Sequence, residues 1–138
     1  MTRAGTRRKV DAAFAAGRIR SARDFMKAAQ DGLDLAQEGR NAAPIVSSIV
    51  NAAIAFCDAV TARRGNVANA QDHGGAPALL REILGNDLPR EQEARFRRIL
   101  GEKDASQYGA KALSLALARK RMQDLTRFAA WAEDQVAG

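Results

Sequence analysis

The stretch that decides the fold is IVSSIVNAAIAFCDAV, residues 45–60. Within it, Ile45, Ile49, Ala53, Phe56 and Val60 recur every three or four residues, which is the spacing of one face of an α-helix. Apolar residues also fill the neighbouring rows of that helix. A helix that is apolar around most of its circumference needs neighbours on several sides. The stretch therefore predicts a central, buried helix over about residues 42–64.

An amphipathic segment lies upstream of this central helix. Its apolar stripe runs through Ile19, Met26 and Leu33 at helical spacing. The stripe predicts a helix over residues 18–38, with an earlier start near residue 10 if Gly17 does not break it. Such a helix has one apolar face with which to cover the central helix.

Further helical patterns follow downstream, separated by turn signals. They predict a short helix closed by Gly85, a helix that starts at Pro89, and a long helix over residues 104–136. No alternating pattern predicts a strand. A chain of 138 residues has room for one core. We therefore expect an all-α fold, an antiparallel four- to five-helix bundle over residues 18–138.

The net charge of +6 is concentrated at the N-terminus. Residues 1–28 hold eight basic residues against Asp11 and Asp24, whereas residues 29–138 are balanced. We expect residues 1–17 to form a basic, partly disordered arm. The excess charge fits either a solvated surface or a contact with nucleic-acid phosphates or an acidic partner. The candidate nucleic-acid-binding residues are Arg3, Arg7, Arg8, Lys9, Arg18, Arg20, Arg23 and Lys27.

Cysteine usage and hydrophobicity bound the class of protein. The single cysteine, Cys57, excludes an internal disulfide framework, and its apolar neighbours indicate a buried side chain. No run of about 18 apolar residues predicts a membrane span. The N-terminus also lacks the apolar core of a secretory signal. These features favour a cytoplasmic protein that does not enter a membrane.

No catalytic, metal or cofactor constellation is recognisable in the sequence. The only histidine is His73, and neither a Walker motif nor a dinucleotide fingerprint is present. Asp58 is the exception that needs explaining, because a carboxylate on the most apolar helix is costly unless it is paired or exposed. The candidate partners are His73, Lys103 and Tyr108, which with Asp58 would form a polar ligand-binding cluster. The alternative is that Asp58 lies on an exposed polar edge of its helix.

Several short motifs, in this order, resemble the small bacterial HEPN-domain proteins, an all-helical bundle family. The resemblance covers roughly residues 20–136. It rests on the segments Ala53-Ile54-Ala55-Phe56-Cys57-Asp58-Ala59, Gln71-Asp72-His73, Leu79-Leu80, Leu100-Gly101-Glu102-Lys103, Tyr108, Arg127-Phe128 and Trp131-Ala132.

The resemblance implies a HEPN-like bundle, a tendency to form homodimers and the polar cluster described above. The family's ribonucleases carry an Arg separated from a His by four to six residues, and Asn66, Val67 and Ala68 occupy those positions before His73. The ribonuclease motif is therefore absent. We expect a non-enzymatic HEPN-like binding module whose ligand is a nucleic acid or nucleotide. The alternatives are an unusual ribonuclease built on the polar cluster, and a protein-partner component of a toxin–antitoxin pair.

Overall fold

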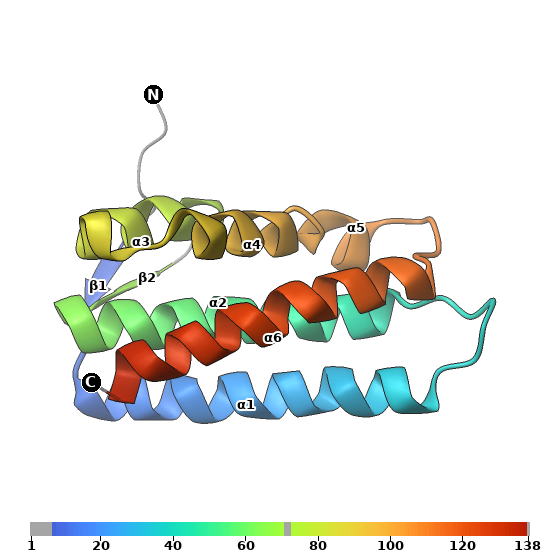
Figure 1. Ribbon diagram of the computed structural model, residues 1–138, viewed down its shortest axis with the longest axis horizontal. Helices are drawn as coiled ribbons and strands as arrows, with labels where there is room; N and C mark the ends of the chain where they lie inside the picture. Colours follow the sequence, from blue (N-terminus) through green and yellow to red (C-terminus); the bar gives the residue numbers. More distant parts are fainter. Residues whose placement is uncertain (1–6, 71–72, 138) are drawn as a thin grey trace.

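The protein is an all-α helical bundle with one short two-stranded sheet (Figure 1). The computed structural model describes residues 7–70 and 73–137. The elements in chain order are β1 (Arg7–Lys9), α1 (Ala12–Leu35), α2 (Ala43–Gly65), β2 (Val67–Asn69), the 3-10 turn η1 (His73–Gly75), α3 (Ala76–Leu84), the 3-10 turn η2 (Gly85–Asp87), α4 (Arg90–Leu100), α5 (Lys103–Tyr108) and α6 (Leu115–Ala137).

Helix α2 is the central helix, as the sequence predicts. Every residue from Ala52 to Ala62 is buried, because α1, α3, α4, α5 and α6 all pack around it. Figure 1 shows α1 and α6 running beside α2, with α3, α4 and α5 forming a further row on the other side. The aromatic core lies where α4 meets α6: the rings of Phe96 and Phe128 stack with their centroids 5.0 Å apart.

Helix α1 packs against α2 through small residues. Ala15, Ala22 and Ala29 are spaced seven residues apart on α1 and are 2%, 0% and 0% exposed. Further along the same helix, a Cβ added to Gly32 would lie only 2.9 Å from the Ile45 Cγ1 atom of α2. Small side chains let two helix backbones approach closely, so α1 and α2 form a close contact along this face.

Helix α1 begins at Ala12, as the alternative start near residue 10 predicted, which corrects the start at residue 18 and the arm over residues 1–17. Asp11 caps the helix, since its carboxylate accepts a hydrogen bond of 2.9 Å from the backbone N–H of Phe14. Gly17 stays inside the helix. A helical glycine costs only about 1 kcal/mol relative to alanine, and the burial of Ala15 and Ile19 on either side compensates for it.

Part of the predicted arm is a strand, which the sequence did not predict. Residues Arg7–Lys9 pair antiparallel with Val67–Asn69, with Arg8 opposite Ala68. The strand β2 starts because Asn66, with a left-handed φ of 55°, ends α2 and turns the chain. The backbone N–H of Val10 then donates to the carbonyl of Asn66 at 2.9 Å. The expected disorder is thus wrong for residues 7–9, and residues 1–6 lie outside the described residues.

The predicted long helix over residues 104–136 is two helices, α5 and α6. The residues between them are held by the start of α2: Leu113 donates its N–H to the Asn41 side chain at 2.9 Å, and its carbonyl accepts from Ala42 at 2.9 Å. Ser114 then caps α6, accepting at 3.1 Å from the N–H of Leu117. Contacts with a distant segment therefore outweigh the continuous helical pattern.

Candidate functional site between α1 and α6

Asp58 is buried, and its partner is a residue that the sequence assigned elsewhere. The Asp58 side chain on α2 is 10% exposed and forms an ion pair of 3.2 Å with Arg18 on α1. The charge pattern of the sequence assigned Arg18 to nucleic-acid binding. The alternative of an exposed polar edge is excluded, because Asp58 as a whole residue is only 7% exposed.

Burial changes the proton affinity of Asp58. Desolvation raises the pKa of this carboxyl from 3.8 to about 6, while the charges of Arg18 and Arg8 and the hydrogen bond from Arg18 lower it. Desolvation is the larger effect, because the carboxylate loses water that a single guanidinium only partly replaces. The pair thus ties α1 to α2 with a group that titrates near neutral pH.

The other members of the predicted polar cluster lie elsewhere in the bundle. Lys103 and Tyr108 are on α5, at the end of the bundle where α2 begins (Figure 1). The Lys103 Nζ atom lies 5.3 Å from the centroid of the Tyr108 ring, and Tyr108 is 76% exposed. His73 begins η1, after β2, near the opposite end of α2. The structure therefore brings Lys103 and Tyr108 together, but it pairs Asp58 with Arg18 rather than with Lys103.

Intramolecular contacts occupy most of the candidate nucleic-acid-binding residues. Arg7, Arg18, Arg23 and Lys27 form ion pairs with Glu82, Asp58, Glu133 and Asp31, respectively. The Arg8 guanidinium stacks over the Phe14 ring at 5.0 Å. Lys9 and Arg20 are exposed, and Arg3 lies outside the described residues. The excess charge is thus less available to a ligand than the sequence suggested.

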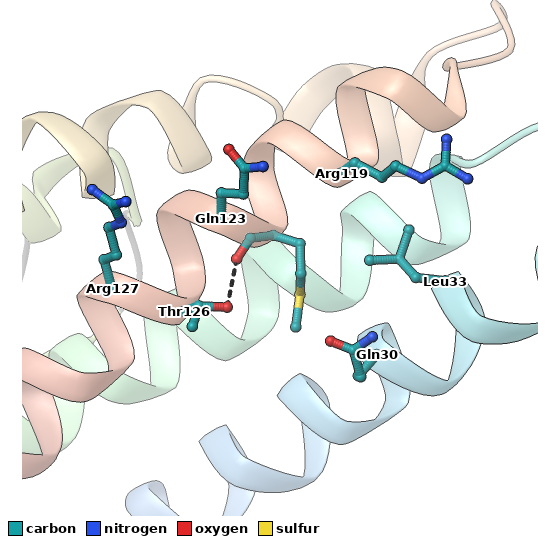
Figure 2. A pocket seen from close by; sticks show the side chains of 7 residues that line it. Gln30, Leu33, Arg119, Gln123, Thr126 and Arg127 are labelled. Carbon is teal, nitrogen blue, oxygen red and sulfur yellow. Dashed lines mark hydrogen bonds between the residues drawn. The ribbon is translucent and has the colours of Figure 1, made fainter.

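A groove between α1 and α6, which sequence reasoning missed, lies on the surface of the bundle. Two hollows of about 510 and 400 Å³ adjoin there and share the lining residues Gln30, Met122 and Thr126. Figure 2 shows Gln30 and Leu33 projecting from α1 below a row of α6 residues, Arg119, Gln123, Thr126 and Arg127. The dashed line marks the Thr126 hydroxyl donating to the Met122 carbonyl at 2.9 Å. We call this feature, with the residues that line its two hollows, the α1–α6 groove.

An ion pair between the two sides lies at each end of the groove. At one end Arg23 of α1 makes two hydrogen bonds, 2.7 and 2.6 Å long, to the Glu133 carboxylate of α6. At the other end Arg119 of α6 pairs at 3.2 Å with Glu38, which follows α1. Glu133 is 14 residues beyond Arg119 on α6, and these 14 steps correspond to about 21 Å at 1.5 Å per residue.

The floor of the groove is apolar and its sides are polar. Phe56 of α2 lies at the base, with Met26, Leu33, Met122 and Ala129 around it. Methionine adapts its shape to different apolar partners, so two of them in one groove suit a binding surface. The lining offers no nucleophile paired with a base. Over residues 7–70 and 73–137, no three His, Cys, Asp or Glu side chains are placed to hold a metal ion.

The sequence carried only a weak signal of this groove. Met26 and Leu33 belong to the stripe that predicted α1, and Met122 to the stripe that predicted α6. Each stripe was therefore assigned wholly to the core. Whether an apolar stripe is fully covered depends on the distance between two helices, which a single-helix pattern does not contain.

Comparison with known proteins supports the fold. No protein-family model matches the chain, and no curated protein matches it. Among solved structures, the chain is similar to the crystal structure of TT1696 from Thermus thermophilus. The TM-score is 0.71 at 18% sequence identity, covering 88% of this chain and 97% of that chain. This likeness shows a shared bundle architecture.

Helix α2 is also the one described helix whose length and composition would allow it to cross a membrane. Its most apolar window is, however, 78% buried within the bundle. That burial is typical of the core helix of a globular fold, since its apolar surface is already covered by protein.

Proposed function

We propose that this chain is a non-enzymatic interaction module that binds a segment of another protein in the α1–α6 groove. This is the protein-partner alternative raised by the sequence, and it includes one component of a toxin–antitoxin pair. The observation that carries it is a continuous groove, about 21 Å long, with an apolar floor that reaches Phe56. Phe56, Met122 and Ala129 at its base are almost fully buried, and the half-buried Met26 and Leu33 supply the apolar surface that a partner would contact.

Site-specific photo-cross-linking in the cells that encode the chain tests this function. A photoreactive amino acid replaces Gln123 in the groove or, as a control, the exposed Glu91 of α4. The proposal expects a discrete protein adduct from position 123 that position 91 does not give. Ala130→Trp, which fills the groove from an exposed position, should abolish that adduct. Equal adducts at both positions, or none at position 123, would contradict the proposal.

Nucleic-acid binding is the second candidate function. The observation in its favour is the net charge of +6, together with Lys9 and Arg20, which are exposed near the N-terminus. Other exposed cations are, however, far apart along the chain: Arg40 lies between α1 and α2, Arg90 on α4 and Lys120 on α6. A phosphate-binding surface needs its cations along one face.

The salt dependence of binding separates this candidate from the first. If Lys9 and Arg20 contact duplex DNA, replacing both with alanine should flatten the log–log salt slope by about 1.8. Arg40→Ala with Lys111→Ala removes the same charge from the opposite end of the bundle and should leave the slope unchanged. Equal effects of the two double variants would indicate only non-specific attraction, and the candidate would be abandoned.

A further inference from the structure

We propose that the occupant of the α1–α6 groove is an amphipathic α-helix of a partner protein, whose apolar stripe is flanked by acidic residues. This inference rests on the proposed function and specifies the kind of partner. It follows from three features of the groove: the nature of its walls, the charge of its sides, and the poor fit of a second copy of the chain.

The walls of the groove favour a helix over an extended peptide. Both walls are α-helices, α1 and α6, whose backbone hydrogen-bonding groups are already used within each helix. An extended segment on the apolar floor would find no strand edge with which to pair its N–H and C=O groups. A helix satisfies those groups internally and offers apolar side chains at positions i, i+3, i+4 and i+7. The length of about 21 Å corresponds to about 14 helical residues.

The charge of the sides favours acidic flanks on that helix. Three of the four cations that line the groove, Arg23, Lys27 and Arg119, already pair with Glu133, Asp31 and Glu38, so the positive charge left over is that of Arg127. In the part of the chain that the structure describes, Arg127 makes no ion pair. In Figure 2 its guanidinium points away from Gln30 and Leu33, so its charge lies on the outer side of α6. Acidic residues there would complement the excess positive charge.

A second copy of the chain fits the same groove poorly. A two-fold symmetric contact places the same surface on both sides of the interface. Two grooves facing each other would therefore bring together two unpaired Arg127 side chains and no free carboxylate of the lining, because Asp31 and Glu133 are already paired. A partner of different sequence, with acidic residues beside its apolar stripe, avoids that cost.

The first experiment maps the segment that is cross-linked from position 123. Mass spectrometry of the adduct should identify a stretch with apolar residues at helical spacing and a net negative charge. A basic segment, a stretch with alternating apolar residues, a nucleic acid, or this chain itself would overturn the inference. These outcomes still show a groove occupant, so they are distinct from the absence of an adduct, which overturns the proposed function.

The second experiment measures the affinity of a synthetic peptide with the mapped sequence by fluorescence anisotropy at 0.15 M salt. Arg127→Glu should weaken binding at least tenfold. Lys120→Glu is the matched control, because it makes the same change of charge at an exposed position of α6 outside the groove lining. It should change affinity less than twofold. Equal weakening by both variants, or none by Arg127→Glu, would contradict the role of the groove's charge.

A helix-breaking change in the peptide tests its conformation. Proline at the centre of the peptide should reduce affinity at least tenfold, because it removes a backbone hydrogen bond and clashes with the preceding turn. Alanine at the same position is the control and should bind within about threefold of the parent peptide if that residue faces solvent. Unchanged binding of the proline peptide would mean that the occupant is not helical.

Discussion

Helix α1 contacts its two neighbours in opposite ways. Toward α2 it presents Ala15, Ala22 and Ala29, which are almost fully buried, and Gly32, which closely approaches Ile45. Toward α6 it presents Met26, Gln30 and Leu33, and two hollows remain between the helices. The side chains at a contact set the distance between two helix axes. Small residues therefore make a seam that is part of the core, and long ones leave a surface that can accept another molecule.

The ion pairs of α1 show the same contrast. Arg18 pairs with the buried Asp58 of α2, and the two side chains are 29% and 10% exposed. Arg23, five residues further on, pairs with Glu133 of α6, and these side chains are 58% and 34% exposed. A buried carboxylate depends on its partner, whereas water replaces the partner of an exposed one. The predictions below test that difference.

The largest expected effect is the pH dependence of stability caused by Asp58. Its pKa is 3.8 in an unstructured chain and about 6 in the folded protein. Between these values the folded state holds more protons than the unfolded state, so the free energy of unfolding falls as pH rises. The two pKa values differ by about two units, and each unit corresponds to about 1.4 kcal/mol, so the free energy of unfolding should fall by about 3 kcal/mol in total. Urea denaturation at pH 4 to 7 measures it.

Asp58→Asn is the control for this pH dependence and should remove the fall in stability between pH 4 and 6. Three carboxyls whose pKa is lowered act in the opposite direction: Glu82 by the hydrogen bond from Arg7, Glu93 by the hydrogen bond from Arg81, and Asp124 by Arg98 and Arg121 against its desolvation. Their effect lies below about pH 4.5, where they take up protons. A protein whose stability rises steadily from pH 4 to 6 would contradict the assignment to Asp58.

The second prediction compares packing on the two sides of α1. Ala22→Leu should lower the free energy of unfolding by about 2 kcal/mol, because Ala22 is fully buried in the seam with α2. Ala130→Leu adds the same atoms in the groove and should change stability by less than about 0.5 kcal/mol. Chemical denaturation of both variants measures the difference. Equal losses would mean that the groove is as closely packed as the seam.

The third prediction concerns the buried ion pair. Arg18→Met leaves Asp58 without its strongest cation and raises the pKa of Asp58 further. Proton uptake then limits the damage. The pKa of Asp58 in the parent protein is about 6, so protonating its carboxylate at pH 7, one unit above that value, costs about 1.4 kcal/mol. The free energy of unfolding of the variant should therefore fall by about this amount at pH 7. At pH 5 the defect should nearly vanish, because Asp58 is already protonated. A defect of equal size at both pH values would show lost packing rather than lost charge.

The smallest expected effect belongs to the exposed pair across the groove. Arg23→Met should change the free energy of unfolding by less than about 0.5 kcal/mol, and equally at pH 5 and pH 7. Thermal and urea denaturation check this expectation beside Arg18→Met. Exposed ion pairs contribute at most about 1 kcal/mol. A larger loss would mean that the contact between α1 and α6 depends on the Arg23–Glu133 ion pair. The two sides of α1 would then be more alike than their burial indicates.

The sequence predicted elements well where the pattern was local. Helix α2, predicted over residues 42–64, runs from Ala43 to Gly65, because its apolar residues and the closing glycine are all within the segment. The break between α5 and α6 was missed, since it depends on Asn41 and Ala42 meeting Leu113 from more than 70 residues away. The strand β1 was missed for the same reason, because its partner is β2.

The same division applies to the candidate site. The residues alone predict an all-α bundle around α2 and show that Asp58 must be either paired or exposed, because helical periodicity and the cost of burying a charge are properties of a single segment. Only the tertiary structure decided that the partner is Arg18 and that α1 and α6 enclose a groove. The partner of a charged side chain and the distance between two helices depend on which helix faces lie opposite each other. The packing of the whole bundle fixes that arrangement.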